Sequence, residues 1–167
     1  TLEILVIRSP FPRAGFVFGD LDGWRASQPG IVAVLTAADV PGRNVFGVIP
    51  AFADQPAFAE GTARFRGEAV AAVVGTPATI RAFDPATFPL TWTEPPAVEV
   101  PATAEAAGAP LLHEDRTGNL MCKGFVACGD AEAALAAADV TVEGRFASGF
   151  VEHAYIEPEA GAAWMEG

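Results

Sequence analysis

Lysine is the scarcest charged residue in this chain of 167 residues, with Lys123 as the only example. Lys and Arg together number 10, against 21 Asp and Glu, and the formal net charge is -11. Affinity for nucleic acid and for anionic membranes rests on cationic side chains that neutralise phosphate. We therefore expect neither nucleic acid nor a membrane surface among the partners.

Long apolar runs and cysteines are also scarce. No stretch of about 18 apolar residues occurs, so we expect no membrane-spanning helix. Cys122 and Cys128 are the only cysteines, too few for a disulfide framework and typical of a reducing compartment. We therefore expect the protein to be cytoplasmic.

Several catalytic and metal-binding patterns are missing. The serines lie in no Gly-x-Ser-x-Gly turn, and neither common phosphate-binding glycine loop is present. Cys122, Cys128, His113 and His153 offer zinc-ligand chemistry, but the spacing between the cysteines is not that of a zinc knuckle. We interpret the two cysteines as small apolar residues that pack on one face of a strand.

The best local candidate for the wall of a site is the pair His153 and Glu157, which would share one face of a strand. Pro158 follows directly and favours an extended conformation at Glu157. A structural histidine that only satisfies hydrogen bonds is the alternative interpretation. The local pattern leaves both open.

The apolar content lies largely in short runs, of which Ala69 to Val74 is the most continuous. Gly67 and Gly75 bound this run, which is too short for a buried helix and rich in valine. It predicts a central strand covered on both faces. The segments that we expect to pack on it are Phe16 to Phe18, Ile31 to Leu35, and Leu111 with Leu112.

Strand and helix signals alternate along the chain and predict an α+β fold. We expect further strands at 2–7, 16–18, 31–35, 90–93 and 140–146, and helical turns at 20–28, 76–83 and 130–138. Thr36 and Asp39 have the spacing of a capping box. The stretch 43–61 reads as a long loop that packs through its phenylalanines.

Five motifs occur in an order and spacing that resemble a known family. They are Arg8-Ser9-Pro10, Pro29 to Gly42, Arg66 to Val74, Gly129 to Gly144, and Glu152 to Glu159. Together they resemble the start of the molybdenum-binding large subunit of the xanthine dehydrogenase and aldehyde oxidase family.

The resemblance implies a domain order. Residues 1–110 would form an α/β hammerhead domain, 111–129 a linker, and 130–167 the first strands of a truncated molybdopterin-binding domain. Glu166-Gly167 resembles the opening of a hairpin whose returning strand is missing, so we expect an N-terminal fragment. Without that partner, 140–167 is expected to be disordered or paired with a neighbouring molecule.

The resemblance also implies an activity. Enzymes of this family hydroxylate an aldehyde or an N-heteroaromatic ring with oxygen from water, at a molybdenum centre bound to molybdopterin. Electrons leave through iron-sulfur clusters, commonly to FAD, on partner domains or subunits. The implied partners are those groups, the remainder of the large subunit and a small-molecule substrate, and the fragment would be inactive alone.

The resemblance places Phe150 and Val151 at the cofactor. A glutamine beside the metal often occupies the second position in the family, whereas valine donates no hydrogen bond. Either this branch orders its metal centre differently or Val151 is a wall residue. The family's catalytic base and most pterin contacts would lie outside this chain, so we assign no catalytic residue and no metal ligand.

A non-catalytic interaction domain that works by itself is the alternative function. An acidic, phenylalanine-rich surface with few reactive side chains would suit it. The length of the open reading frame discriminates between the two, because an enzyme subunit requires several hundred further residues.

Overall fold

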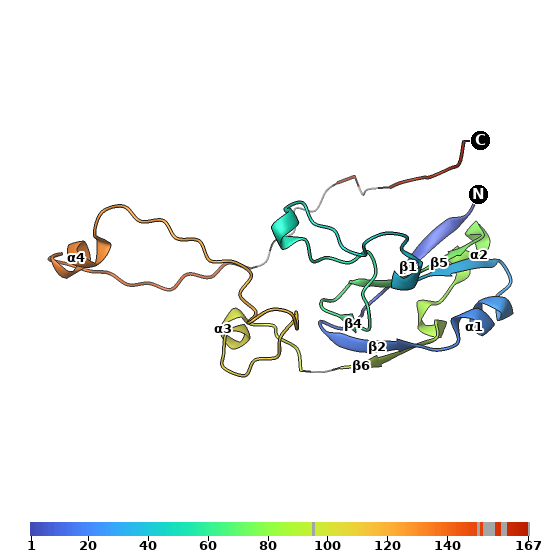
Figure 1. The fold of residues 1–167 in the computed structure, drawn as a ribbon, viewed down its shortest axis with the longest axis horizontal. Coiled ribbons are helices and arrows are strands. Elements are labelled where there is room, and N and C mark those ends of the chain that lie inside the picture. The colour runs from blue at the N-terminus through green and yellow to red at the C-terminus, as the bar shows by residue number, and fades with distance from the viewer. Residues whose placement is uncertain (95, 150, 152–155, 158–159, 167) are drawn as a thin grey trace. The chain divides into compact units, whose positions relative to one another are not determined.

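The computed structural model describes residues 1–94, 96–149, 151, 156–157 and 160–166. The chain forms two compact units, Thr1–Lys123 and Gly124–Gly167, and each is considered by itself. The first unit holds two three-stranded antiparallel sheets (Figure 1). Within the described part of the chain, no helix is both long and apolar enough to cross a bilayer.

The first sheet is built around β5 (Ala69–Gly75), as the valine-rich run predicted. β1 (Glu3–Arg8) pairs with one edge of β5 and β3 (Ile31–Leu35) with the other. Five of the seven β5 residues are buried, because strands occupy both edges and side chains cover both faces. The prediction of a central strand is confirmed.

The second sheet has β2 (Ala14–Phe18) in the middle, between β4 (Thr62–Ala63) and β6 (Leu90–Thr93). Phe16 lies opposite Trp92, and their rings meet edge to face at 5.6 Å between centroids. Such offset aromatic pairs add stability beyond the area that they bury.

The core contains residues of both sheets. Val70 and Val73 of β5 and Phe16 of β2 belong to one buried cluster. Ile31 is part of it too, but β3 lies beside β5 in the sheet instead of covering its face. The predicted packing of Leu111 and Leu112 on β5 is wrong: both are half-buried outside this cluster, held by the polar contacts described below.

The predicted helix starts are confirmed by their caps. The carboxylate of Asp20 accepts the N–H of Gly23, Thr76 caps the helix that begins at Pro77, and Thr36 and Asp39 form the capping box. The helical segments of the first unit are α1 (Leu21–Ser27), α2 (Pro77–Ala82), α3 (Pro101–Ala104), and the 3-10 turns Ala37–Asp39, Pro50–Phe52 and Pro85–Thr87. α1 packs against β3, and α2 against β1 and β5.

Gly75, the last residue of β5, has no room for a side chain. A Cβ atom there would lie 2.7 Å from the carbonyl oxygen of Gly30. We expect Gly75→Ala to lower the free energy of unfolding by about 2 kcal/mol, because the backbone must shift to relieve the overlap. Urea denaturation measures this, with Gly42→Ala as control, since a Cβ at Gly42 meets nothing within 4 Å. Equal effects of the two substitutions would contradict the prediction.

The second unit contains α4 (Ala131–Ala136), capped by Asp130 as predicted, although it ends before Ala138. The predicted half-buried strand at 140–146 is wrong for this chain. These residues form no strand, and Val142 and Phe146 are 92% and 93% exposed. An alternating apolar pattern forms a strand only where a ladder partner and a packing face exist, and the described residues offer neither to 140–146.

Candidate functional site

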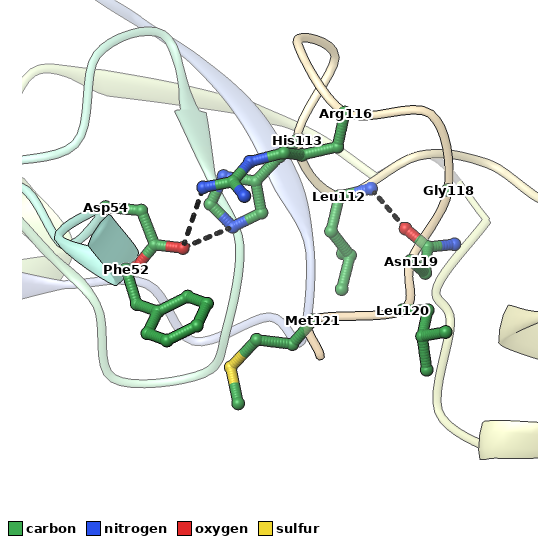
Figure 2. A pocket seen from close by; sticks show the side chains of 9 residues that line it. All are labelled: Phe52, Asp54, Leu112, His113, Arg116, Gly118, Asn119, Leu120 and Met121. Carbon is green, nitrogen blue, oxygen red and sulfur yellow. Dashed lines mark hydrogen bonds and ion pairs between the residues drawn. The ribbon is translucent and has the colours of Figure 1, made fainter. Parts of the chain in front are cut away.

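A cavity of about 180 Å³ opens between the loop after the 3-10 turn Pro50–Phe52 and the segment 112–121. Figure 2 shows its lining: Phe52, Asp54, Leu112, His113, Arg116, Gly118, Asn119, Leu120 and Met121. All of these residues belong to the first unit. The cavity therefore joins two segments that are about 60 residues apart in the sequence.

Asp54 is the charged centre of the cavity. Its Oδ2 lies 3.8 Å from Nε2 of His113 and 3.9 Å from the Arg116 guanidinium (Figure 2). The 3-10 turn positions Asp54, while a turn in which the Arg116 N–H donates to the His113 carbonyl places the two basic groups together. All three side chains are partly exposed, so the pairs contribute under about 1 kcal/mol each to stability.

The opposite wall is apolar. Phe52, Leu120 and Met121 contribute to it, and each is exposed to solvent. The cavity thus presents hydrogen-bond donors and one carboxylate on one side and an apolar surface on the other. Its volume suits a single ring or a short side chain, because larger ligand pockets measure about 300 to 1,000 Å³.

This cavity by itself does not fit molybdopterin. The cavity is too small for a pterin with its side chain, and its charged groups are already paired with each other. Among the residues that the structure describes, no group of three or more His, Cys, Asp or Glu side chains is placed to hold a metal ion.

The resemblance placed Phe150 and Val151 at the cofactor. Val151 belongs to the second unit and is 81% exposed, and Phe150 lies outside the described residues. His153 also lies outside them, while Glu157 is exposed. The pairing of His153 with Glu157 thus stays a prediction.

The cysteines are exposed, so their interpretation as packed apolar residues is wrong. The segment that carries them, 120–128, forms no strand and offers no packing face. Of the four zinc-type residues, the structure brings His113 to the cavity. The sequence analysis did not identify Asp54 and Arg116 as site residues. No local motif links Asp54 in its loop to the turn that begins at His113, 59 residues later.

Two family models match the chain in succession. The model described as "Aldehyde oxidase and xanthine dehydrogenase, a/b hammerhead domain" matches residues 4–82. The model described as "Molybdopterin cofactor-binding domain" matches residues 112–167. Phe52 and Asp54 therefore lie in the first match and the rest of the cavity lining in the second.

Curated relatives match over almost the whole chain. A probable xanthine dehydrogenase subunit of Bacillus subtilis is 33% identical over 162 residues, which is 96% of this chain and 21% of the relative. The nicotinate dehydrogenase large molybdopterin subunit of Eubacterium barkeri is 31% identical over 163 residues, 96% of this chain and 37% of the relative. The chain thus spans about a fifth to two fifths of these relatives.

The fold is similar to part of a solved structure. The aldehyde oxidoreductase of Desulfovibrio gigas superposes with a TM-score of 0.67 and 25% identity, covering 86% of this chain and 16% of that one. Together with the hammerhead match at 4–82, this confirms the predicted α+β class.

Proposed function

The chain belongs to the aldehyde oxidase and xanthine dehydrogenase family, and we propose from this that it is the N-terminal part of the large subunit of a molybdenum hydroxylase. The observation that carries the proposal is the order of the two matches. A hammerhead segment, 4–82, and then a molybdopterin cofactor-binding segment, 112–167, occur here in that order in one chain.

The proposed reaction converts a C–H group of an aldehyde or N-heteroaromatic ring into C–OH. The oxygen comes from water, and two protons and two electrons are released. Molybdopterin-bound molybdenum, held by the complete subunit, would supply the redox chemistry for this electron pair, and iron-sulfur and FAD domains or subunits are the proposed partners. Since the chain spans only about a fifth to two fifths of its relatives, we assign this chemistry to the complete subunit.

The role of this chain is to supply a scaffold and the first part of the cofactor-binding region. We assign residues 1–110 to the hammerhead domain, 111–129 to a linker, and 130–167 to the start of the molybdopterin-binding domain. Phe150 and Val151 are proposed to reach the cofactor in the complete subunit. The free cysteines Cys122 and Cys128 support a cytoplasmic location.

Molybdenum analysis and product labelling test the proposal. The full-length protein that contains this chain, purified with its partner subunits, should carry molybdenum and hydroxylate at least one of hypoxanthine, nicotinate and simple aldehydes. In isotopically labelled water, the label should enter the product.

The chain alone should show neither property, because it lacks a complete cofactor site. Turnover by residues 1–167 alone would contradict the proposal. So would a full-length protein, expressed with molybdenum and its partners, that contains no molybdenum.

A further inference from the structure

Two arginines of the first unit bind neighbouring backbone carbonyls of a distant segment. Arg13 donates from its terminal guanidinium nitrogen to the Leu111 carbonyl at 3.2 Å, and Arg64 donates from Nε to the Leu112 carbonyl at 3.0 Å. We infer that Arg13 and Arg64 are positioning residues that fix where the cofactor-binding region begins. The part of this inference that concerns the cofactor rests on the proposed function.

Arg64 is itself held in place by a buried carboxylate. Its backbone N–H donates to the side chain of Glu68, which is only 3% exposed. The Glu68 carbonyl in turn accepts the N–H of Ser9, just beyond β1. Glu68 directly precedes β5, so the position of Arg64 depends on the central strand of the first sheet.

Arg13 is anchored in the second sheet. It directly precedes Ala14, the fully buried first residue of β2. Among the residues that the structure describes, its Nε is buried with no hydrogen-bond partner, and its terminal nitrogen makes the hydrogen bond to the Leu111 carbonyl. Arg64 directly follows Ala63 of β4, which pairs with Ala14 of β2, so both arginines flank the same pair of strands in the second sheet and bind the same short segment.

Asn119, which lies a few residues further along the chain, also holds this segment through side-chain hydrogen bonds. The Asn119 side-chain oxygen accepts the Leu112 N–H at 2.9 Å, and its amide nitrogen donates to the carbonyls of Ala104 and Pro110 at 3.0 Å each. Both backbone polar groups of Leu112 are therefore used. Two bound carbonyls in succession fix the direction of the backbone as well as its position.

These contacts link the hammerhead match to the start of the cofactor-binding match. The cofactor-binding match begins at Leu112, whereas Arg13 and Arg64 lie within the hammerhead match at 4–82. Because a guanidinium presents several donors in a rigid plane, it fixes a carbonyl more strictly than a lysine does. The hammerhead part thereby determines where the chain enters the cofactor-binding region.

Hydrogen exchange read by mass spectrometry tests the anchor in the full-length protein. In the double variant Arg13→Gln with Arg64→Gln, amides of peptides covering 110–121 should exchange about tenfold faster, as expected for the loss of hydrogen bonds to charged groups. Exchange in β5 should stay unchanged. Molybdenum per protein should fall at least about twofold, since the cofactor-binding region is less well positioned.

Arg25→Gln is the matched control, because it removes the same charge from a side chain that donates to the Val32 carbonyl instead. It should change neither readout. If the double variant does not fold, the single change Arg64→Lys gives the same test, since it keeps the charge without the planar Nε donor. Its exchange rate should lie between those of wild type and Arg64→Gln.

Unchanged exchange at 110–121 would overturn the anchor. Faster exchange with molybdenum at the wild-type level would overturn the positioning role. A wild-type protein without molybdenum would instead contradict the proposed function, and the exchange measurement would still decide whether the anchor exists.

Discussion

Replacing Val73 with aspartate is expected to abolish cooperative folding of the first unit. Val73 is fully buried and lies opposite Leu5 of β1 and Val34 of β3. A carboxylate there has no partner, and its burial costs several kcal/mol or more. Domains of this size are stable by only about 5 to 15 kcal/mol, so this single change removes most or all of the stability.

Circular dichroism during thermal unfolding measures this effect. Val17→Asp is the matched control, because Val17 lies on β2 with 71% of its surface exposed, and it should change stability by under about 0.5 kcal/mol. Val73→Ala should give an intermediate loss of about 2 kcal/mol from the deleted methyl groups. A cooperative transition in Val73→Asp near the wild-type temperature would show that β5 is not the core strand.

The substitution Val142→Asp is expected to have no effect on this chain alone and a large effect on the complete subunit. In this chain Val142 is exposed, so the change should leave the unfolding temperature of residues 1–167 the same. In the full-length protein we expect the alternating residues Val140 to Phe146 to form a strand with one buried face. A buried aspartate on that face should prevent assembly, with loss of most molybdenum and activity.

Thr141→Asp provides the control for this experiment. In a strand, neighbouring side chains point to opposite faces, so an aspartate at residue 141 would face away from the packed side. Molybdenum content and elution volume of the full-length variants are the readouts. Equal behaviour of Val142→Asp and Thr141→Asp would mean that the alternation does not mark a buried face in the complete protein.

Much of the first unit could be predicted from local patterns. The run from Ala69 to Val74 forms β5, because an uninterrupted apolar stretch of that length suits a strand covered on both faces. The caps at Asp20, Thr36 and Thr76 were equally visible, since a cap depends on residues at most three positions apart. The family was identifiable from ordered motifs, and the comparisons confirm it.

Other features depended on long-range contacts. The alternation at 140–146 predicted a strand, but a strand exists only with a pairing partner, and no segment in the described part of the chain pairs with 140–146. Leu111 and Leu112 looked like core residues, whereas the contacts of Arg13 and Arg64 hold their carbonyls outside the core. Composition and periodicity do not record such contacts across about 50 to 100 residues.

The amino-acid sequence alone determined the local elements, their caps and the family, because each rests on residues that are close together or on motifs in a fixed order. Tertiary structure alone decided how Asp54 meets His113 and Arg116, and how two arginines bind consecutive carbonyls. The physical reason is distance along the chain. Side chains that are far apart in sequence acquire a common site only when the strands, turns and loops between them pack together.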